Sequence, residues 1–363
     1  MDTRRALDLT FLLIHSQNTQ SSFKQPIMRL FTTATVAALH ALSTARALHI
    51  PDNVFSLDDL KGADTRPIEH IYAFGDSYTD SCNLFRTFLN DESQAKVPWP
   101  NCPPPPYGRA DLGQSWIEIA QDLQPKWNVS NYASSGATCD NRLQNQGRLD
   151  IDDEVDLFTT NYGKDSAPHE LQENPATSLA VLFIGVNDIH LIQQKKWGQL
   201  SPPSFSNGTV KDSASCVRDK FKRLHSLGFR RFLLFELPPL DYSAAMGSTP
   251  QHALSTANQV AHFNAFARQY ADGLLHQWKD DSTISIFPTS KLMTPMMQLN
   301  PAYDFKHGQG KYCTAISGGC ARPHEYTWTD DLHPSLRVFQ LMANAFVRFL
   351  DPGFESGLIF SGL

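Results

Sequence analysis

A serine that follows an apolar segment is the first residue of this chain that could carry out chemistry. Ser77 lies in HIYAFGDSYTD, residues 70–80, directly after the apolar run 71–74. The run has the character of a buried strand, and open α/β sheets place their sites just past the carboxyl ends of their strands. Gly, Asp and Ser are also common turn residues, so the tripeptide alone fits both a nucleophile and an ordinary turn.

A serine nucleophile needs a base within hydrogen-bond reach and a group that orients the base. The chain has 13 histidines, and His333 differs from the others because Asp330 stands three residues before it, in DDLHP. If that loop folds back, Asp330 can reach Nδ1 of the ring and leave Nε2 free for the serine proton. The alternative is the acid-rich start of a helix that we expect to begin at Pro334.

Two further residues could stabilise a developing oxyanion. Gly136 follows a brief strand, and its missing Cβ lets a backbone N–H approach a ligand closely. Asn187 follows the apolar segment 178–186 and could offer a side-chain N–H. Each alone is an ordinary turn residue. With Ser77, however, they fall at the ends of three consecutive predicted strands, and a parallel sheet would bring them to one edge.

The elements that must position these residues alternate between strand and helix. Apolar runs predict five strands, and apolar residues spaced by three and four predict helices between them. The strands are expected within 71–74, 131–141, 178–188, 231–239 and 284–287, and the helices at about 114–123, 150–161, 216–227, 253–278 and from 334 onward. A polar loop is expected after residue 188. The pattern predicts one three-layer α/β/α domain over residues 48–363 with a mainly parallel five-stranded sheet.

The N-terminal region and the cysteines indicate export. Within the extension 1–47, residues 28–47 resemble a secretory signal peptide, with Arg29 before a weakly apolar stretch and Ala45-Arg46-Ala47 at its end. The apolar stretch is too short for a membrane core of ~30 Å, so no membrane anchor is expected. All 6 cysteines follow this leader, which suggests disulfides formed in an oxidising compartment.

Further features of the sequence bear on export and on binding partners. Cys313 and Cys320 flank a short Gly-containing loop and are the expected disulfide pair. Asn128 and Asn207 stand in N-glycosylation motifs, usable only in a secreted chain. The formal charge of -6 is spread along the chain, so we expect no nucleic-acid partner. No two cysteines have the Cys-x-x-Cys spacing that is typical of zinc sites, so we expect no metal centre.

The ordered blocks FGDSYTD, NYASSGATCDN, IGVND and DDLHPS resemble those of the GDSL esterases and lipases, also called SGNH hydrolases. The resemblance spans about residues 72–334. It implies a flavodoxin-like α/β/α fold, with Ser77 as nucleophile, His333 as base and Asp330 as the group that orients the base. The backbone N–H groups of Ser77 and Gly136 and the side chain of Asn187 would form the oxyanion hole, and no metal or cofactor is implied.

Further segments resemble secreted fungal acetylesterases of carbohydrate esterase family sixteen: PPYGR at 105–109, GQSWIEIA at 113–120 and Tyr-Thr-Trp at 326–328. The resemblance implies a secreted, monomeric serine esterase that removes acetyl groups from carbohydrates. Tyr78 departs from the leucine that gives the wider family its name. Asp76, Trp116 and Trp328 are the candidate substrate contacts, although Trp is more often a core residue. The alternatives are a lipase or phospholipase acting on longer acyl esters and a secreted binding module without catalysis.

Overall fold

A computed structural model of the chain describes residues 63–84, 114–161, 171, 173–314 and 320–354. All of them belong to one compact unit, Thr44–Leu363. The expected leader within residues 1–47 and the PPYGR segment lie outside the described residues.

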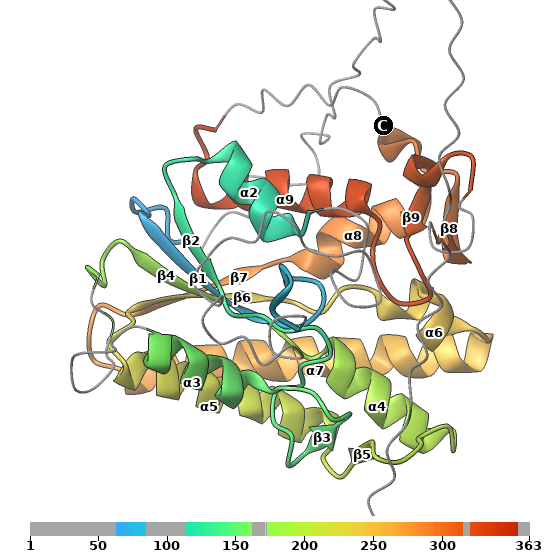
Figure 1. The fold of residues 1–363 in the computed structure, drawn as a ribbon, viewed down its shortest axis with the longest axis horizontal. Helices are drawn as coiled ribbons and strands as arrows, with labels where there is room; N and C mark the ends of the chain where they lie inside the picture. The colour runs from blue at the N-terminus through green and yellow to red at the C-terminus, as the bar shows by residue number, and fades with distance from the viewer. Residues whose placement is uncertain (1–62, 85–113, 162–170, 172, 315–319, 355–363) are drawn as a thin grey trace, which may run out of the picture. The chain divides into compact units, whose positions relative to one another are not determined.

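A five-stranded sheet forms the centre of this unit (Figure 1). Its strands run in the order β2-β1-β4-β6-β7, and every neighbouring pair is parallel. The strands are β1 (His70–Gly75), β2 (Asn128–Asn131), β4 (Ser178–Phe183), β6 (Arg231–Phe235) and β7 (Thr283–Phe287). This confirms the predicted α/β fold with a parallel five-stranded sheet.

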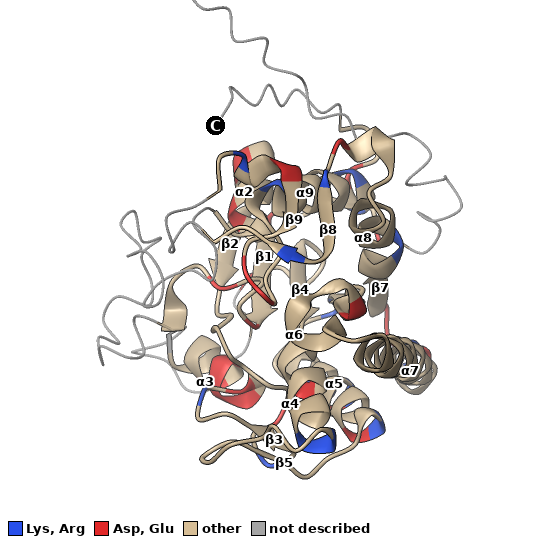
Figure 2. Cartoon of the chain, turned by 90° about the vertical axis from the view of Figure 1, so that its right-hand side faces the viewer, with Lys and Arg blue, Asp and Glu red and all other residues tan. Residues whose placement is uncertain are grey.

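Helices cover both faces of the sheet, as Figure 1 shows. One layer holds α2 (Trp116–Leu123), α8 (Thr289–Met297) and α9 (Leu336–Leu350), and the other holds α3 (Ile151–Asn161), α4 (Val186–Lys196), α5 (Val210–Ser226) and α7 (Pro250–Gln277). The short helix α6 (Ala244–Gly247) packs against α7. Basic and acidic residues occur on helices of both layers (Figure 2).

The sheet is buried on both faces, which explains its nearly continuous apolar strands. All six residues of β4 and all five of β6 are buried. Aromatic rings fill the space between β6 and the α2/α9 layer, where Trp116 lies 4.5 Å from Phe235 and 4.9 Å from Phe346 between ring centroids. Pairs at these separations add stability beyond the area they bury.

Two helices that the sequence analysis did not predict appear after strands. The segment expected to be a loop after residue 188 is α4, whose buried face includes Asn187, Asp188 and Gln193. This polar buried face hides the apolar spacing that would have indicated a helix. The helix α8 was also missed, and it contains Pro295, a residue that usually argues against a helix interior.

Helix starts differ from the predictions because side-chain caps set them. The last helix begins at Leu336 rather than Pro334, since the Ser335 hydroxyl accepts a hydrogen bond from the Val338 N–H. Likewise α5 begins at Val210, six residues before the predicted Cys216, because Thr209 and Asp212 form a capping box.

Small paired segments and disulfides complete the unit. The short strands are β3 (Gln144–Asn145) with β5 (Phe205–Ser206) and β8 (His307–Tyr312) with β9 (Tyr326–Trp328), and the 3₁₀ turns are Leu240–Tyr242, Pro301–Tyr303 and Pro323–Glu325. Disulfides join Cys139 to Cys216 and Cys313 to Cys320, the second being the expected pair. Asn128 and Asn207 are both exposed. Within the described residues, no helix has the length and apolar content needed to cross a membrane.

Candidate active site

Three side chains form a hydrogen-bonded chain at the carboxyl end of the sheet. Ser77 lies in the turn after β1, and His333 and Asp330 lie on the loop between β9 and α9. The Ser77 Oγ is 2.8 Å from His333 Nε2, and His333 Nδ1 is 2.7 Å from Asp330 Oδ2. The structure therefore brings together the serine, histidine and aspartate that the sequence singled out, although 256 residues separate the serine from the histidine.

The loop that carries His333 is folded around the Asp330 carboxylate. Asp330 Oδ1 accepts the backbone N–H of His333 at 2.6 Å and that of Leu332 at 2.8 Å, while Oδ2 faces the imidazole. Burial raises the pKa of Asp330, but hydrogen bonds and the charge of His333 outweigh burial and hold this pKa below its ordinary value. An ionised Asp330 assigns the proton to Nδ1 of His333, so Nε2 is the nitrogen that can accept from Ser77.

Tyr78 connects the serine to the histidine loop by a second route. Its side chain is fully buried, and its hydroxyl donates to the Leu332 carbonyl oxygen at 2.7 Å. Its ring centroid lies 5.9 Å from that of His333. The tyrosine that departs from the family's leucine thus fixes the position of the loop next to the base.

Three N–H groups that were expected to form an oxyanion hole are available as donors. Within the described residues, the backbone N–H groups of Ser77 and Gly136 donate to no protein acceptor. The Asn187 side chain donates one N–H to the Ala137 carbonyl oxygen at 2.9 Å. Because an amide carries two N–H donors, a second one remains for another acceptor. These are the three groups that the sequence analysis expected to form an oxyanion hole.

Glycine is required on both sides of this position. Gly136 has φ +87°, and a Cβ added to it would lie 2.6 Å from Cγ of Arg148. At Gly75, which ends β1, a Cβ would overlap the backbone carbonyl oxygen of Phe183 on the neighbouring strand. Close approach of β1 to β4 therefore fixes where the turn to Ser77 begins.

Four carboxylates at the carboxyl end of the sheet are buried, and the sequence patterns predicted no structural role for them. Burial raises the pKa of Asp76 to about 7 and that of Asp188 to about 6. Burial also raises the pKa values of Asp80 and Glu154. Glu154 lies in the acidic run 150–154, which looks like the acid-rich start of a helix, so only the three-dimensional fold shows that its side chain contacts Gly75 at the end of β1.

The three candidate substrate contacts lie in the protein interior. Asp76 and Trp116 are 0% exposed and Trp328 is 1% exposed. The Trp116 indole N–H donates to Thr79 Oγ1 at 3.1 Å, within the aromatic cluster of the core. The structure therefore places these three side chains in the interior rather than on an exposed surface that a substrate could contact, and Asp76 accepts the backbone N–H of Tyr78.

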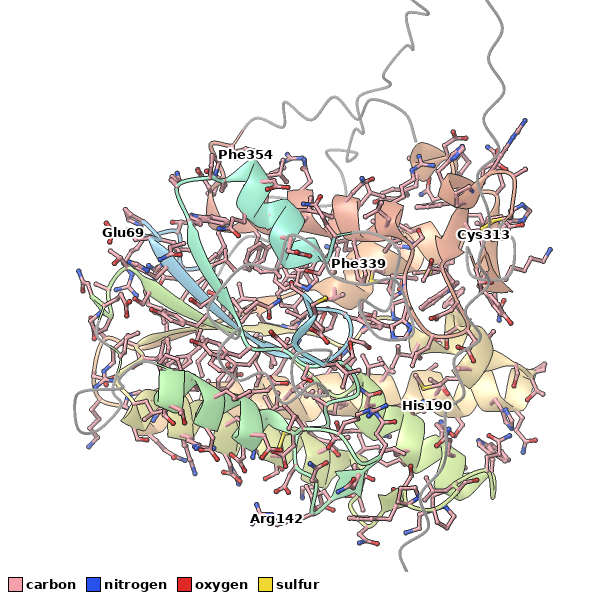
Figure 3. All side chains as sticks on the ribbon, in the orientation of Figure 1. Glu69, Arg142, His190, Cys313, Phe339 and Phe354 are labelled. Carbon is pink, nitrogen blue, oxygen red and sulfur yellow. A yellow bond between two sulfur atoms is a disulfide. The ribbon has the colours of Figure 1, made fainter. Side chains whose placement is uncertain are left out.

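His190 and the Cys313–Cys320 disulfide lie in different parts of the structure. Figure 3 shows Cys313 beside β8 and β9, away from His190 on α4. His190 is half-buried, and burial lowers its pKa; the nearby charge of Asp331 acts in the opposite direction, and that of His333 adds to the decrease. Among the described residues, no group of three or more His, Cys, Asp or Glu side chains could hold a metal ion.

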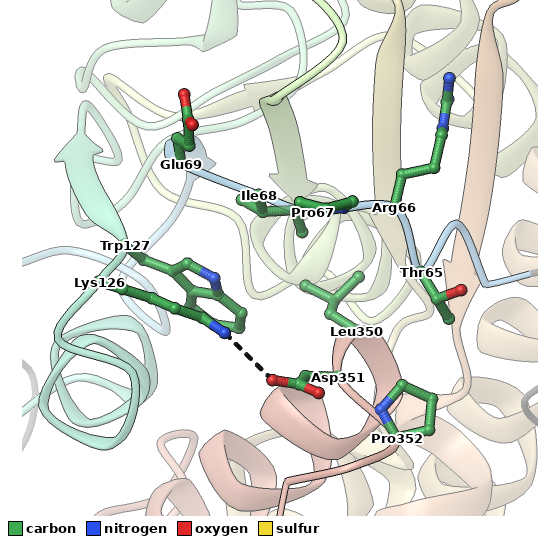
Figure 4. Close-up of a pocket in the computed structure, with 10 residues that line it drawn as sticks. All are labelled: Thr65, Arg66, Pro67, Ile68, Glu69, Lys126, Trp127, Leu350, Asp351 and Pro352. Carbon is green, nitrogen blue, oxygen red and sulfur yellow. Dashed lines mark hydrogen bonds and ion pairs between the residues drawn. The ribbon is translucent and has the colours of Figure 1, made fainter.

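A cavity of about 540 Å³ lies at the other end of the sheet, where the strands begin (Figure 4). It is lined by residues that precede β1 and β2 and by the end of α9, and an ion pair of 3.3 Å joins Lys126 to Asp351 there. Neither a serine nor a histidine lines it. The serine, histidine and N–H donors are all at the opposite edge, which is therefore the candidate active site.

Comparison with known proteins finds a matching family and several similar proteins. Residues 71–346 match the family described as GDSL-like Lipase/Acylhydrolase. An acetylesterase from Hypocrea jecorina is 23% identical over 343 residues, covering 82% of this chain and 92% of that protein. Among solved structures, an acetyl xylan esterase has a TM-score of 0.39 at 12% identity over 76% of this chain and 97% of its own. Another crystal structure has a TM-score of 0.43, also at 12% identity, over 79% and 98%.

The chain belongs to the GDSL-like lipase/acylhydrolase family, because the family match spans most of its length. The match begins at the start of β1 and ends within α9, so it includes both the serine and the histidine. The protein is a carboxylic ester hydrolase of the SGNH type, and the acetylesterase relative supports the same class.

Proposed function

We propose that the protein hydrolyses acetyl esters of carbohydrates, with Ser77 as nucleophile, His333 as general base and Asp330 as the residue that orients the base. The hydrogen-bonded chain from Asp330 through His333 to Ser77 carries this proposal. Its distances of 2.7 and 2.8 Å are those expected of a base in position to take the serine proton.

In the first half of the proposed reaction, Ser77 Oγ attacks the ester carbonyl carbon while His333 Nε2 takes the hydroxyl proton. Asp330 stabilises the imidazolium that forms. The carbonyl oxygen becomes an oxyanion and accepts hydrogen bonds from the N–H groups of Ser77, Gly136 and Asn187. Such donors are effective because they are held in place before charge develops.

In the second half, His333 returns its proton to the alcohol oxygen as the C–O bond breaks, which leaves an acyl group on Ser77. Water then attacks this acyl-enzyme, with His333 again acting as base, and releases the acid. The same donors stabilise both tetrahedral intermediates. Apart from the ester and water, every group in the proposed cycle belongs to the chain.

Two lines of reasoning support acetyl carbohydrates as substrates. The alignment with this chain covers 92% of the length of the acetylesterase relative. The segments 113–120 and 326–328 resemble fungal carbohydrate acetylesterases. Of the described residues in these segments, Trp116, Ile117 and Trp328 are buried in the core. Their side chains would thus act on specificity through the shape of the site, since Trp116 and Trp328 themselves are buried.

An acyl-length series tests this proposal. Chromogenic esters from acetyl to long-chain acyl groups are compared with acetylated xylo-oligosaccharides, and Ser77→Ala is the control. We expect preference for acetyl groups, release of acetate from the oligosaccharides and loss of activity in Ser77→Ala. Preference for long chains would instead indicate a lipase or phospholipase. Activity no higher than that of Ser77→Ala would indicate a binding module.

We also propose that the protein is exported with a cleaved leader. The disulfides, the leader-like residues 28–47 and the exposed acceptors Asn128 and Asn207 support this proposal. Mass spectrometry of protein from the culture medium should find a new N-terminus near residue 48. It should also find glycans at these asparagines. Retention of the native chain inside the cell would contradict export.

A further inference from the structure

Two segments must lie at a fixed separation for the proposed oxyanion hole to work. The nucleophile turn, residues 75–80, carries the N–H of Ser77, and the oxyanion loop, residues 134–137, carries the N–H of Gly136. They are far apart from each other in sequence, and neither belongs to a helix or strand beyond Gly75. One backbone hydrogen bond joins the two segments where β1 ends, because the Ser134 N–H donates to the Gly75 carbonyl oxygen at 3.0 Å. Beyond this bond, no strand pairing of the described residues continues toward Ser77 and Gly136, so side-chain contacts must hold these two N–H groups at their separation.

Glu154, from α3, contacts both segments at residues that precede the two donors in the sequence. Its Oε2 accepts the backbone N–H of Gly75 at 2.8 Å, and its Oε1 accepts that of Ser134 at 3.0 Å. The side chain is 0% exposed. One carboxylate thus holds the first residue of the nucleophile turn and the first residue of the oxyanion loop, with one oxygen for each.

Asp80 makes the same kind of connection on the other side of Ser77. Its Oδ2 accepts both the backbone N–H and the hydroxyl of Ser135, each at 2.7 Å. Asp80 is itself fixed to the turn, because its backbone N–H donates to the Asp76 carbonyl oxygen at 3.0 Å. Ser135 directly precedes Gly136, so this contact lies one residue from the second proposed oxyanion donor.

Burying a carboxylate away from water costs free energy. Burial without hydrogen bonds is strongly unfavourable for a charged group, and none of the hydrogen bonds described for Glu154 or Asp80 comes from a Lys or Arg side chain. What they gain is contact with several backbone N–H groups at once, because a carboxylate has two acceptor oxygens. An amide of the same shape would place an NH₂ group against one of those donors.

We propose that Glu154 and Asp80 are positioning residues that set the separation between the oxyanion donors of Ser77 and Gly136. The proposal rests on the proposed function of these donors. It extends that function, because it assigns catalytic importance to two side chains that touch no reacting atom. Small errors in position matter here, since a misplacement of about 1 Å can lower a rate about a hundredfold.

The main test is Glu154→Gln, which keeps the size of the side chain and removes one acceptor. Competent sites are counted by labelling Ser77 with a fluorophosphonate, and kcat and KM on a chromogenic acetyl ester are given per labelled site. We expect kcat to fall about tenfold to a hundredfold. KM and the shape of the pH–rate profile should stay unchanged, because the Ser77–His333–Asp330 bonds are not altered. Affinity for a boronic acid, which forms a tetrahedral adduct on Ser77, should fall with kcat.

A matched control removes a hydrogen bond to a buried carboxylate far from the site. The Thr283 hydroxyl donates to Asp64 Oδ2 at 2.7 Å, at the end of the sheet where the strands begin. Thr283→Val should lower the melting temperature and leave kcat per labelled site unchanged. If Glu154 served stability alone, Glu154→Gln would behave like this control, with wild-type kcat and boronate affinity, and the proposal would be wrong.

A gentler variant decides the question if Glu154→Gln fails to fold. Ser135→Ala deletes only the hydroxyl that donates to Asp80, and we expect kcat per labelled site to fall about two- to tenfold. Wild-type kcat in Ser135→Ala would then overturn the proposal. Failure of the proposed function looks different: the wild-type protein would not be labelled at Ser77, or Ser77→Ala would keep its activity.

Discussion

Buried charged groups have different partners at the two ends of the central sheet. Where the strands begin, the Arg231 guanidinium is 0% exposed and forms an ion pair of 2.7 Å with Asp64. It also donates to the carbonyl oxygens of Arg66, Pro67 and Ala176. Where the strands end, the buried carboxylates of Asp76, Asp80, Glu154 and Asp188 instead accept hydrogen bonds from backbone N–H groups and from a serine hydroxyl.

The pKa values follow from this difference. Burial raises the pKa of Asp64, but hydrogen bonds from Arg66, Thr283 and Arg231 outweigh it and hold this pKa far below its ordinary value. For the four buried carboxylates at the other end burial dominates, and it raises the pKa of Asp76 to about 7. Where the strands begin, an ion pair stabilises the fold. Where the strands end, carboxylates without an Arg or Lys partner hold loops in place through backbone N–H groups. Stability and activity should therefore respond to mutations at different ends.

The largest expected effect on activity comes from the carboxylate that orients His333. Asp330→Asn should lower kcat about 10⁴-fold, because the amide favours the wrong tautomer of the imidazole. Chromogenic-ester kinetics measure the loss, and urea denaturation should show that the free energy of unfolding changes little. A variant within tenfold of wild-type kcat would contradict the role of Asp330.

At the opposite end, Asp64→Asn should alter stability and leave the chemistry intact. Removing one partner of a buried ion pair leaves the Arg231 charge uncompensated, and the free energy of unfolding should fall by about 3–5 kcal/mol. Denaturant unfolding measures this change. If kcat per labelled Ser77 fell in parallel, the two ends would not be functionally separate.

A single oxyanion donor should have a somewhat smaller effect. Asn187→Ala removes a side-chain donor and should cost ~2.7–4 kcal/mol of transition-state stabilisation, a decrease in kcat of roughly two to three orders of magnitude. KM should stay close to wild type, because the oxyanion exists only in the transition state and the tetrahedral intermediates. Near-normal turnover in this variant would remove Asn187 from the oxyanion hole.

The smallest effect concerns how stability depends on pH. Asp76 and Asp188 titrate near 7 and 6 in the folded protein but near 3.8 when unfolded, so the folded state binds more protons between these values. Their contribution is therefore fully present below about pH 4 and is lost as pH rises through about 6 to 7. The free energy of unfolding should decrease from pH 5 to pH 8, and Asp76→Asn should reduce this slope. An unchanged slope in the variant would contradict the raised pKa of Asp76.

The sequence allowed the main features of the fold to be predicted, because strands buried on both faces leave a strong apolar signal. The segments of β1, β4, β6 and β7 were all recognisable in this way. The same reasoning placed Ser77, Gly136 and Asn187 at one edge, since parallel strands end together. It failed for α4, whose buried side chains are polar.

The positioning groups were harder to predict, because their roles depend on contacts between distant segments. Glu154 shares its acidic run with buried Asp150 and with half-buried Asp152 and Asp153, and no local pattern identifies it as the residue that contacts Gly75. Trp116 and Trp328 have the aromatic rings that bind sugars, but the same rings fill cores, and only packing distinguishes the two uses. Residue type therefore identified the reacting groups, whereas the residues that support them required the structure.

The separation of 256 residues between Ser77 and His333 has a consequence for how the enzyme is made. During translation, Ser77 is synthesised early, and His333 is added only when nearly the whole domain has been synthesised. Until the loop before α9 docks on Tyr78, the nascent chain has a serine without its base. Ester hydrolysis can therefore begin only after long-range contacts have formed, and such contacts form slowly compared with local ones. Recovery of activity during refolding should accordingly report the completion of the fold.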